Sequence, residues 1–186
     1  MKHGIVALLV ACLLLSGCGA PAAEEGQSPE IVAKKTELSK LPALASFTAK
    51  TAENKDFSSK DLEGKSCTVV VVWSGQDEDV NKYLGDLRAW ADLLPKDIQV
   101  ITICTDYEDD GKYVLNEANY NGTTLVSGDE DYLEFVGAIE KTPTAVAIDT
   151  DGTLLAEPLE GVPDDLQTAY GKLLNQALAQ KGIAIG

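Results

Sequence analysis

Cysteine and histidine are the residues that most often carry redox, nucleophilic or metal chemistry, and this sequence has few of them. The four cysteines are Cys12, Cys18, Cys67 and Cys104, and the single histidine is His3. No two cysteines have the Cys-x-x-Cys spacing of a redox pair or the spacing of a zinc site. Histidine-dependent catalytic triads and histidine metal sites are therefore excluded beyond the first residues, and thiol chemistry is left to single cysteines.

Residues 66–80, SCTVVVVWSGQDEDV, have the pattern of a buried strand, a tight turn and the start of a helix. Residues 69–72 are four consecutive valines, and such a β-branched run indicates a strand buried on both faces. Small and acidic residues follow at 74–79, and apolar residues then recur at helical spacing up to Leu94. In α/β folds backbone N–H groups and the helix dipole point toward such a turn, so we expect the functional site here.

The elements expected around this turn form an α/β domain. Strands are expected at 47–52, around Phe57, and at 68–73, 98–104, 123–126, 145–148 and 154–156, the last as the return strand of a hairpin. Helices are expected at 77–94, 112–119 and 129–138, with an acidic loop at 106–111 and a last helix beginning near 163–165. The strands at 68–73 and 98–104, joined by a helix, predict a right-handed βαβ unit.

The charge of the chain excludes some partners. The sequence has 30 acidic and 15 basic residues, which gives a formal net charge of −15. A nucleic-acid-binding surface must be basic, so we expect no nucleic-acid partner. The same charge argues against a domain that lies flat on an anionic membrane.

The first residues are expected to be a leader rather than part of the fold. A short basic start and an apolar run too short to span a bilayer end in Leu15-Ser16-Gly17-Cys18, which resembles the bacterial lipobox. We therefore expect residues 1–17 to be a lipoprotein signal peptide and Cys18 to carry the lipid that anchors the chain in the membrane. Residues 18–37 are rich in Ala, Pro, Glu, Gly and Ser up to about Lys35, and are expected to be a flexible tether. Residues 38–186 are the expected domain.

The ordered set of elements resembles the TlpA/ResA-like membrane-tethered redoxins. The matching segments are 47–65, 68–73, 98–106, 141–144 with its Thr-Pro pair, 145–152 with its Asp-x-Asp-Gly turn, and 162–178. The resemblance implies an α/β, thioredoxin-like three-layer fold, in which helices flank a central mixed sheet that carries an N-terminal β-hairpin extension. It also implies a location in the bacterial cell envelope, on the extracytoplasmic face of the membrane.

The redox cysteines of that family are missing. Alignment of Trp73 with the family's tryptophan at the strand end places the two redox positions on Asp77 and Val80. A second register, which compares residues 73–77 with thioredoxin's Trp-Cys-Gly-Pro-Cys, requires a deletion and also lacks both cysteines. Thiol–disulfide exchange needs an attacking thiolate and a resolving thiol, and neither Asp77 nor Val80 can supply one.

The interpretation favoured by the sequence is therefore a binding protein with a degenerate redox site. It would bind or scaffold an envelope protein through a groove formed by Trp73, Ser74, Gly75, Gln76, Asp77, Thr142 and Pro143. The resemblance implies a cis Thr142–Pro143 bond beside the redox turn, next to an unpaired backbone edge. We expect no cofactor and no metal.

Three alternatives remain open at this stage. Cys104 ends a strand at the edge where the turn lies, so it could act as the single thiol of a TlpA-type oxidoreductase. The acids at 77–79 could cap the helix, or they could form a site for a cation or a partner. The acidic clusters at 106–110 and 129–131 could hold calcium weakly in a small-ligand or metal-binding lipoprotein. Cys67 is expected at the opposite strand end from Cys104, so we predict no disulfide between them.

Overall fold

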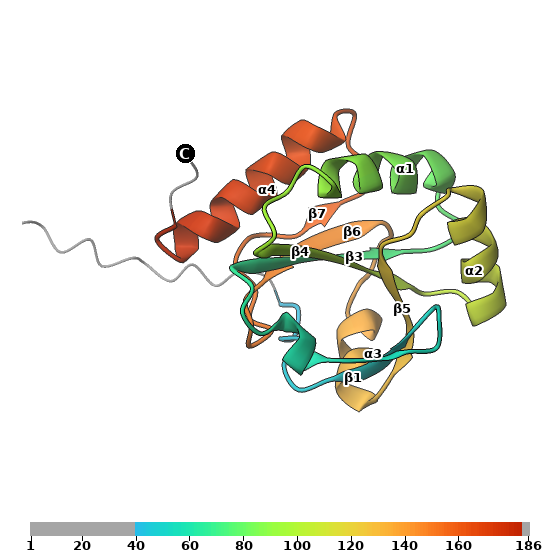
Figure 1. Cartoon of the computed structure of the whole chain (residues 1–186), viewed down its shortest axis with the longest axis horizontal. Coiled ribbons are helices and arrows are strands. Elements are labelled where there is room, and N and C mark those ends of the chain that lie inside the picture. Colours follow the sequence, from blue (N-terminus) through green and yellow to red (C-terminus); the bar gives the residue numbers. More distant parts are fainter. Residues whose placement is uncertain (1–39, 184–186) are drawn as a thin grey trace, which may run out of the picture. The chain divides into compact units, whose positions relative to one another are not determined.

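A seven-stranded mixed sheet organises the computed structural model, which describes residues 40–183 (Figure 1). The strand order is β2-β1-β5-β4-β3-β6-β7, with β3 near the centre and β7 at one edge. The elements in chain order are β1 (Thr48–Thr51), β2 (Asp56–Ser58), the 3-10 helix η1 (Ser59–Leu62), β3 (Cys67–Trp73), α1 (Val80–Ala91), β4 (Ile98–Cys104), α2 (Glu108–Glu117), β5 (Thr123–Gly128), α3 (Glu130–Gly137), β6 (Thr144–Ile148), β7 (Leu159–Glu160) and α4 (Leu166–Gln180).

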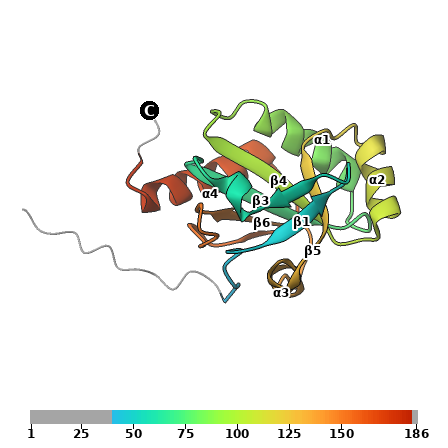
Figure 2. The same cartoon turned by 60° about the horizontal axis from the view of Figure 1, so that its bottom comes forward.

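The central strand β3 is buried along its whole length because helices cover both faces of the sheet. Its odd-numbered residues pack with α1, α2 and α4, and its even-numbered residues Val70 and Val72 pack with α3 and the N-terminal segment. Figures 1 and 2 show α1 and α4 on one face and α3 on the other. The alternation of side chains along a strand explains how one run of valines serves two cores.

The pairing of the strands confirms the expected fold class. β3 and β4 are parallel, from Cys67 opposite Ile98 to Trp73 opposite Cys104, and α1 connects them. β6 pairs with β3 antiparallel, and the β1–β2 hairpin joins the sheet through β5. The result is a thioredoxin-like fold with an N-terminal hairpin extension.

The expected helix after the central strand begins later than predicted. α1 starts at Val80 rather than near residue 77, because Asp79 has a left-handed backbone (φ 54°) and residues 74–77 form a separate turn. The expected acidic loop at 106–111 is also partly wrong, since Glu108, Asp109 and Asp110 form the first turn of α2. Acidic side chains are favourable there because they face the positive end of the helix dipole.

The expected return strand at 154–156 is partly right, since the chain turns back beside β6 there without forming a full strand. Leu154 bridges Ile148 antiparallel, and the Leu155 N–H donates to the Ala147 carbonyl at 2.8 Å. The strand that continues this pairing along β6 is β7, further along the chain. The last helix begins at Leu166 with Asp165 as its N-cap, and its five predicted inward residues are all buried: Leu166, Tyr170, Leu173, Leu174 and Leu178. The expected signal peptide, Cys18 and the whole of the expected tether lie outside the described residues.

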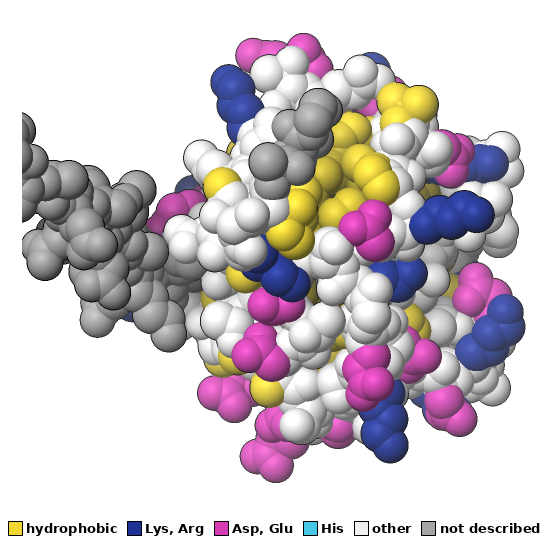
Figure 3. Space-filling model, turned by 60° about the vertical axis from the view of Figure 1, so that its left-hand side comes forward, with side chains coloured by type: hydrophobic (Ala, Val, Ile, Leu, Met, Phe, Trp, Pro, Cys, Tyr) yellow, Lys and Arg dark blue, Asp and Glu magenta, His cyan; other side chains and the backbone are white. Residues whose placement is uncertain are grey.

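The surface seen in Figure 3 has no single basic area, because Lys and Arg side chains are scattered among acidic ones. Among residues 40–183, no helix combines the length and the apolar composition that crossing a membrane requires.

Candidate functional site

The turn between β3 and α1 is held by side chains rather than by helix geometry alone. The backbone N–H of Asp77 donates to the Ser74 carbonyl at 3.0 Å, and the Ser74 N–H donates to Asp77 Oδ2 at 2.8 Å. The Gln76 N–H donates to Ser74 Oγ at 3.1 Å. These bonds close a compact turn directly after the buried end of β3.

Asp106 fixes the other side of the same turn. The Ser74 hydroxyl donates to Asp106 Oδ1 at 2.9 Å, and the Gly75 N–H donates to Asp106 Oδ2. A Cβ atom at Gly75 would lie 3.0 Å from that Oδ2 atom and 3.0 Å from a Val114 methyl group, so only glycine fits without displacement. Asp106 follows β4, whose last residue is paired with Trp73, and this register brings the carboxylate to the turn.

Asp77 also connects the turn to the loop before β6. The Thr142 hydroxyl donates to Asp77 Oδ1 at 2.6 Å, across 65 residues of sequence. The Thr142–Pro143 peptide bond is cis, as the family resemblance predicted. The prediction that the acids at 77–79 cap the helix is wrong, because the N-cap residue Asp79 forms no side-chain capping bond and the first turn of α1 contains no acid.

A groove of about 400 Å³ lies beside this connection. Its lining residues are Asp77, Glu78, Asp79, Thr142, Pro143, Gly161 and Val162. Asp77, Thr142 and Pro143 were predicted from the sequence; Ser74, Gly75 and Gln76 support the turn without lining this groove. Trp73 is wrong as a groove residue because its side chain is fully buried in the core.

Four residues that line the groove were not among its predicted residues: Glu78, Asp79, Gly161 and Val162. Gly161 and Val162 follow β7, whose place in the sheet had been assigned to an earlier segment. Asp106 was also missed: it does not line the groove, but it accepts hydrogen bonds from Ser74 and Gly75 of the turn. Its position two residues after β4, at the sheet edge where the turn lies, could have identified it from the sequence.

The Cys104 thiol lies close to the turn but is not accessible. The residue is only 3% exposed, and a Cβ atom at Gly111 of α2 would approach its Sγ atom to 2.6 Å. The thiol faces the Asp106 carboxylate, with 3.9 Å between Sγ and Oδ2. Burial, together with the nearby negative charge of Asp106, raises the pKa of the Cys104 thiol to about 11. These surroundings oppose formation of the thiolate that attacks disulfides.

Cys67 lies at the opposite end of the β3–β4 pair, as predicted, and both cysteines are free. Burial raises the pKa of the Cys67 thiol to about 12. Among the described residues, neither thiol is therefore placed for disulfide chemistry at the turn.

The acidic clusters take part in the hydrogen bonding of the protein rather than in a ligand set. Within residues 40–183, no three histidine, cysteine or acidic side chains come together to form a set of metal ligands. Asp106 accepts hydrogen bonds from the turn, and Asp129 caps α3 by accepting from the Tyr132 N–H at 3.2 Å. The calcium alternative thus has no ligand set among these residues.

Solved structures share this fold. No protein-family model matches the sequence, and no curated protein matches it. A secreted Mycobacterium tuberculosis disulfide oxidoreductase, homologous to Escherichia coli DsbE, is 20% identical with a TM-score of 0.54, covering 71% of this chain and 93% of its own. The exposed lipoprotein thioredoxin of Streptococcus pneumoniae is 22% identical with a TM-score of 0.57, covering 73% and 99%.

A third similar structure is the thioredoxin domain of a thiol-disulfide oxidoreductase from Bacteroides vulgatus. It is 22% identical with a TM-score of 0.57, and the match covers 74% of this chain and 99% of the Bacteroides vulgatus chain. At these identities the likeness shows a thioredoxin-like fold of the kind found in thiol-disulfide oxidoreductases, and activity must be argued from the site.

Proposed function

We propose that this protein is a lipid-anchored, extracytoplasmic binding protein in which a carboxylate-held turn replaces the redox turn of a thioredoxin fold. The observation that carries the proposal is the pair of carboxylates at the turn: Asp77 and Asp106 accept hydrogen bonds from its backbone and side chains. Cysteine is absent from the turn itself. The groove beside it would bind an extended segment of an envelope protein.

The contact between Asp77 and Thr142 supports the alignment that places a redox position on Asp77. In the family that this chain resembles, the redox turn lies beside the cis-proline loop, and Asp77 is the turn residue that contacts this loop. A carboxylate at that position accepts a hydrogen bond where a thiolate would attack. The exchange reaction therefore has no nucleophile at its usual place.

The alternative of an oxidoreductase that uses Cys104 alone is disfavoured by geometry. That reaction requires an exposed thiolate and an external resolving thiol, whereas the Cys104 sulfur is buried against Gly111. Release of this thiol would require α2 to move away from the end of β4.

The leader pattern and the similar structures support the proposed location. The expected lipobox would place a lipid on Cys18, and residues 18–37 would hold the domain away from the membrane. Two of the structures with this fold are described as a secreted protein and an exposed lipoprotein. A Cys18→Ser variant should lose the lipid and leave the membrane fraction.

The binding proposal can be tested in cells with a photo-crosslinking amino acid placed at Glu78 in the full chain. Glu78 lines the groove, whereas Leu133 is 59% exposed on α3 and provides a matched surface control. We expect a discrete cross-linked protein from position 78 and none from position 133, with loss of the product when Thr142→Trp fills the groove. Equal products from both positions, or none from position 78, would contradict the proposal.

A further inference from the structure

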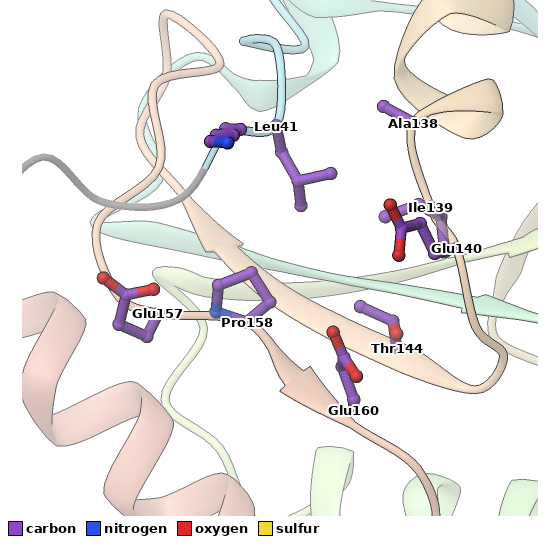
Figure 4. A pocket seen from close by; sticks show the side chains of 9 residues that line it. Leu41, Ala138, Ile139, Glu140, Thr144, Glu157, Pro158 and Glu160 are labelled. Atoms are coloured by element: carbon purple, nitrogen blue, oxygen red, sulfur yellow. The ribbon is translucent and has the colours of Figure 1, made fainter.

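The edge strand β7 has hollows on both faces of the sheet. One hollow, of about 360 Å³, lies on the α3 face and is shown in Figure 4; its lining includes Leu41, Ile139, Thr144 and Glu160. The other, of about 450 Å³, lies on the α4 face and is lined by Leu159, Ala169 and Leu173 among others. Residues 157–158 border both, so the two hollows meet at the edge of the sheet.

One residue of β7 has backbone hydrogen-bonding groups that are free to pair with a further strand. β7 is the last strand in the sheet, with Leu159 opposite Ala145 and Glu160 opposite Thr144. The Gly161 N–H donates to the Pro143 carbonyl at 2.7 Å, so the backbone polar groups of Gly161 point toward β6. In an antiparallel ladder the backbone groups of alternate residues point toward the same neighbouring strand. The N–H and C=O of Leu159 therefore also point toward β6, and those of Glu160 point toward the open edge.

From this arrangement we propose that an extended segment of the partner protein adds to the sheet as a strand along β7, with alternating basic and apolar side chains. The proposal rests on the proposed function and identifies its partner more closely. Successive side chains of an added strand point to opposite faces, so they would enter the two hollows in turn. The segment would then continue past Gly161 and Val162 into the groove beside Asp77, because both residues line that groove.

The two hollows differ in the charge and polarity of their lining residues. This difference determines which side chains of the added segment would fit each hollow. The α3-face hollow carries Glu140, Glu157 and Glu160 above an apolar floor, with Lys40 as its only cationic lining residue. Figure 4 shows Glu140, Glu157 and Glu160 among the side chains that surround this hollow. Glu160 pairs with Lys141 at 3.4 Å, and both side chains are more than half exposed, so this pair opposes a basic guest only weakly.

The α4-face hollow has the more apolar lining of the two. Leu159 and Ala169 pack there against the core beneath α4, and the lining also includes Glu157, Asp165 and Lys172. An apolar side chain fits against this Leu159–Ala169 surface. A second copy of this chain is a poorer occupant than a basic segment, because a symmetric β7–β7 contact would bring acidic residues of two chains with net charge −15 together.

The test uses defined peptides and the ¹⁵N-labelled chain without its leader (residues 19–186). The probe is the acetylated, amidated hexapeptide Lys-Val-Lys-Val-Lys-Val. Its matched controls are Glu-Val-Glu-Val-Glu-Val, with the opposite charge, and Lys-Lys-Lys-Val-Val-Val, with the same composition but no alternation. We expect the alternating lysine peptide to shift the amide resonances of residues 159–162 and to slow hydrogen exchange at the Glu160 N–H, with at least tenfold weaker binding of both controls.

Two variants separate the backbone from the side chain. Glu160→Ala and Glu160→Pro both remove the carboxylate and its pairing with Lys141, but only proline removes the outward N–H. We expect Glu160→Pro to bind the lysine peptide about fivefold more weakly than Glu160→Ala, as loss of one hydrogen bond predicts. Unchanged chemical shifts at the other β6 and β7 residues would show that Glu160→Pro has kept its fold. The chemical-shift changes that the peptide causes in the unmodified chain do not depend on this variant.

The outcomes distinguish the strand-addition proposal from the proposed function. Shifts at Asp77 and Thr142 without shifts at 159–161 would overturn strand addition and leave the groove as a binding site. Equal binding of the proline and alanine variants, or of the alternating and block peptides, would also overturn strand addition. If 1 mM peptide caused no change in chemical shift at any residue, strand addition would be overturned and peptide binding in the groove would lose its support.

Discussion

The Asp77 carboxylate and the Thr142 hydroxyl are 2.6 Å apart, although 65 residues separate them in the sequence. This bond connects the turn after β3 to the loop before β6 that contains the cis Thr142–Pro143 bond. The same carboxylate accepts the Ser74 N–H. Asp77 therefore joins two segments that are far apart in the sequence.

Removal of the Thr142 hydroxyl should destabilise the turn measurably. We expect Thr142→Val to lower the free energy of unfolding by about 1 kcal/mol, because one hydrogen bond to a carboxylate is lost at a half-buried site. Thr142→Ser keeps the hydroxyl and is the matched control, with a smaller loss. Urea unfolding of Thr142→Val, Asp77→Ala and the double variant forms a cycle, and additive effects would show that the two side chains do not interact.

The packing of Gly111 against Cys104 gives a second prediction. Gly111→Ala should destabilise the protein by about 1–3 kcal/mol, because the new methyl group would meet the Cys104 sulfur at 2.6 Å. Cys104→Ala should relieve the clash, so the double variant should be more stable than Gly111→Ala alone. Gly85→Ala on α1 is the control, since nothing lies within 4 Å of its added atom, and it should be neutral or stabilising. Failure of Cys104→Ala to rescue Gly111→Ala would contradict the packing.

The end of α4 is joined to the sheet by a charged pair whose effect depends on pH. Lys181 Nζ lies 2.6 Å from Asp149 Oδ1 and donates to the Ser66 carbonyl at 2.8 Å. Burial opposes ionisation of Asp149, but hydrogen bonds from Lys181 and the Thr150 N–H outweigh it and lower the pKa of the carboxyl group. The folded state thus binds a proton at Asp149 less readily than the unfolded state.

A carboxyl group with a lowered folded-state pKa stabilises the protein above its unfolded-state pKa, and the effect disappears as pH falls through the folded-state value. Asp149→Asn should therefore cost about 1 kcal/mol at pH 7, and this cost should shrink as the pH falls below about 4. Urea unfolding of both proteins across this range measures the difference. A cost that does not change with pH would mean that the charge of Asp149 contributes nothing.

The sequence allowed the fold to be predicted where local patterns decide the structure. The bounds of β4 and the core of β3 follow from continuous apolar runs, and the inward residues of α4 follow from helical spacing. The start of α1 could not be read in this way, because Asp79 has a left-handed backbone that its residue type does not require, and one of the bonds that hold Asp77 comes from Thr142, 65 residues away. β7 was missed because the chain first runs back beside β6 at residues 154–155, and the edge strand itself follows only at Leu159–Glu160.

The sequence predicted where in the fold the candidate site lies, but not the hydrogen bonds and packing that hold it together. Asp77, Thr142 and Pro143 were found through the family pattern, whereas the role of Asp106 depends on the register that sets the end of β4 beside Trp73. The accessibility of Cys104 depends on Gly111 and on the place where α2 packs, and neither can be read from the cysteine's own neighbours in the sequence.

The claim that the turn has no thiol chemistry is tested most directly by insulin reduction and thiol labelling on residues 19–186. With the pKa of Cys104 at about 11, only about 0.1% of a thiol is thiolate at pH 8, and burial restricts it further. We predict no insulin reduction, and labelling of Cys67 and Cys104 by iodoacetamide only after unfolding. An Asp77→Cys variant, with a half-buried thiol at the turn, should label at that position in the folded state and is the positive control. Insulin reduction by the unmodified protein that disappears in Cys104→Ser would contradict the claim and make Cys104 catalytic.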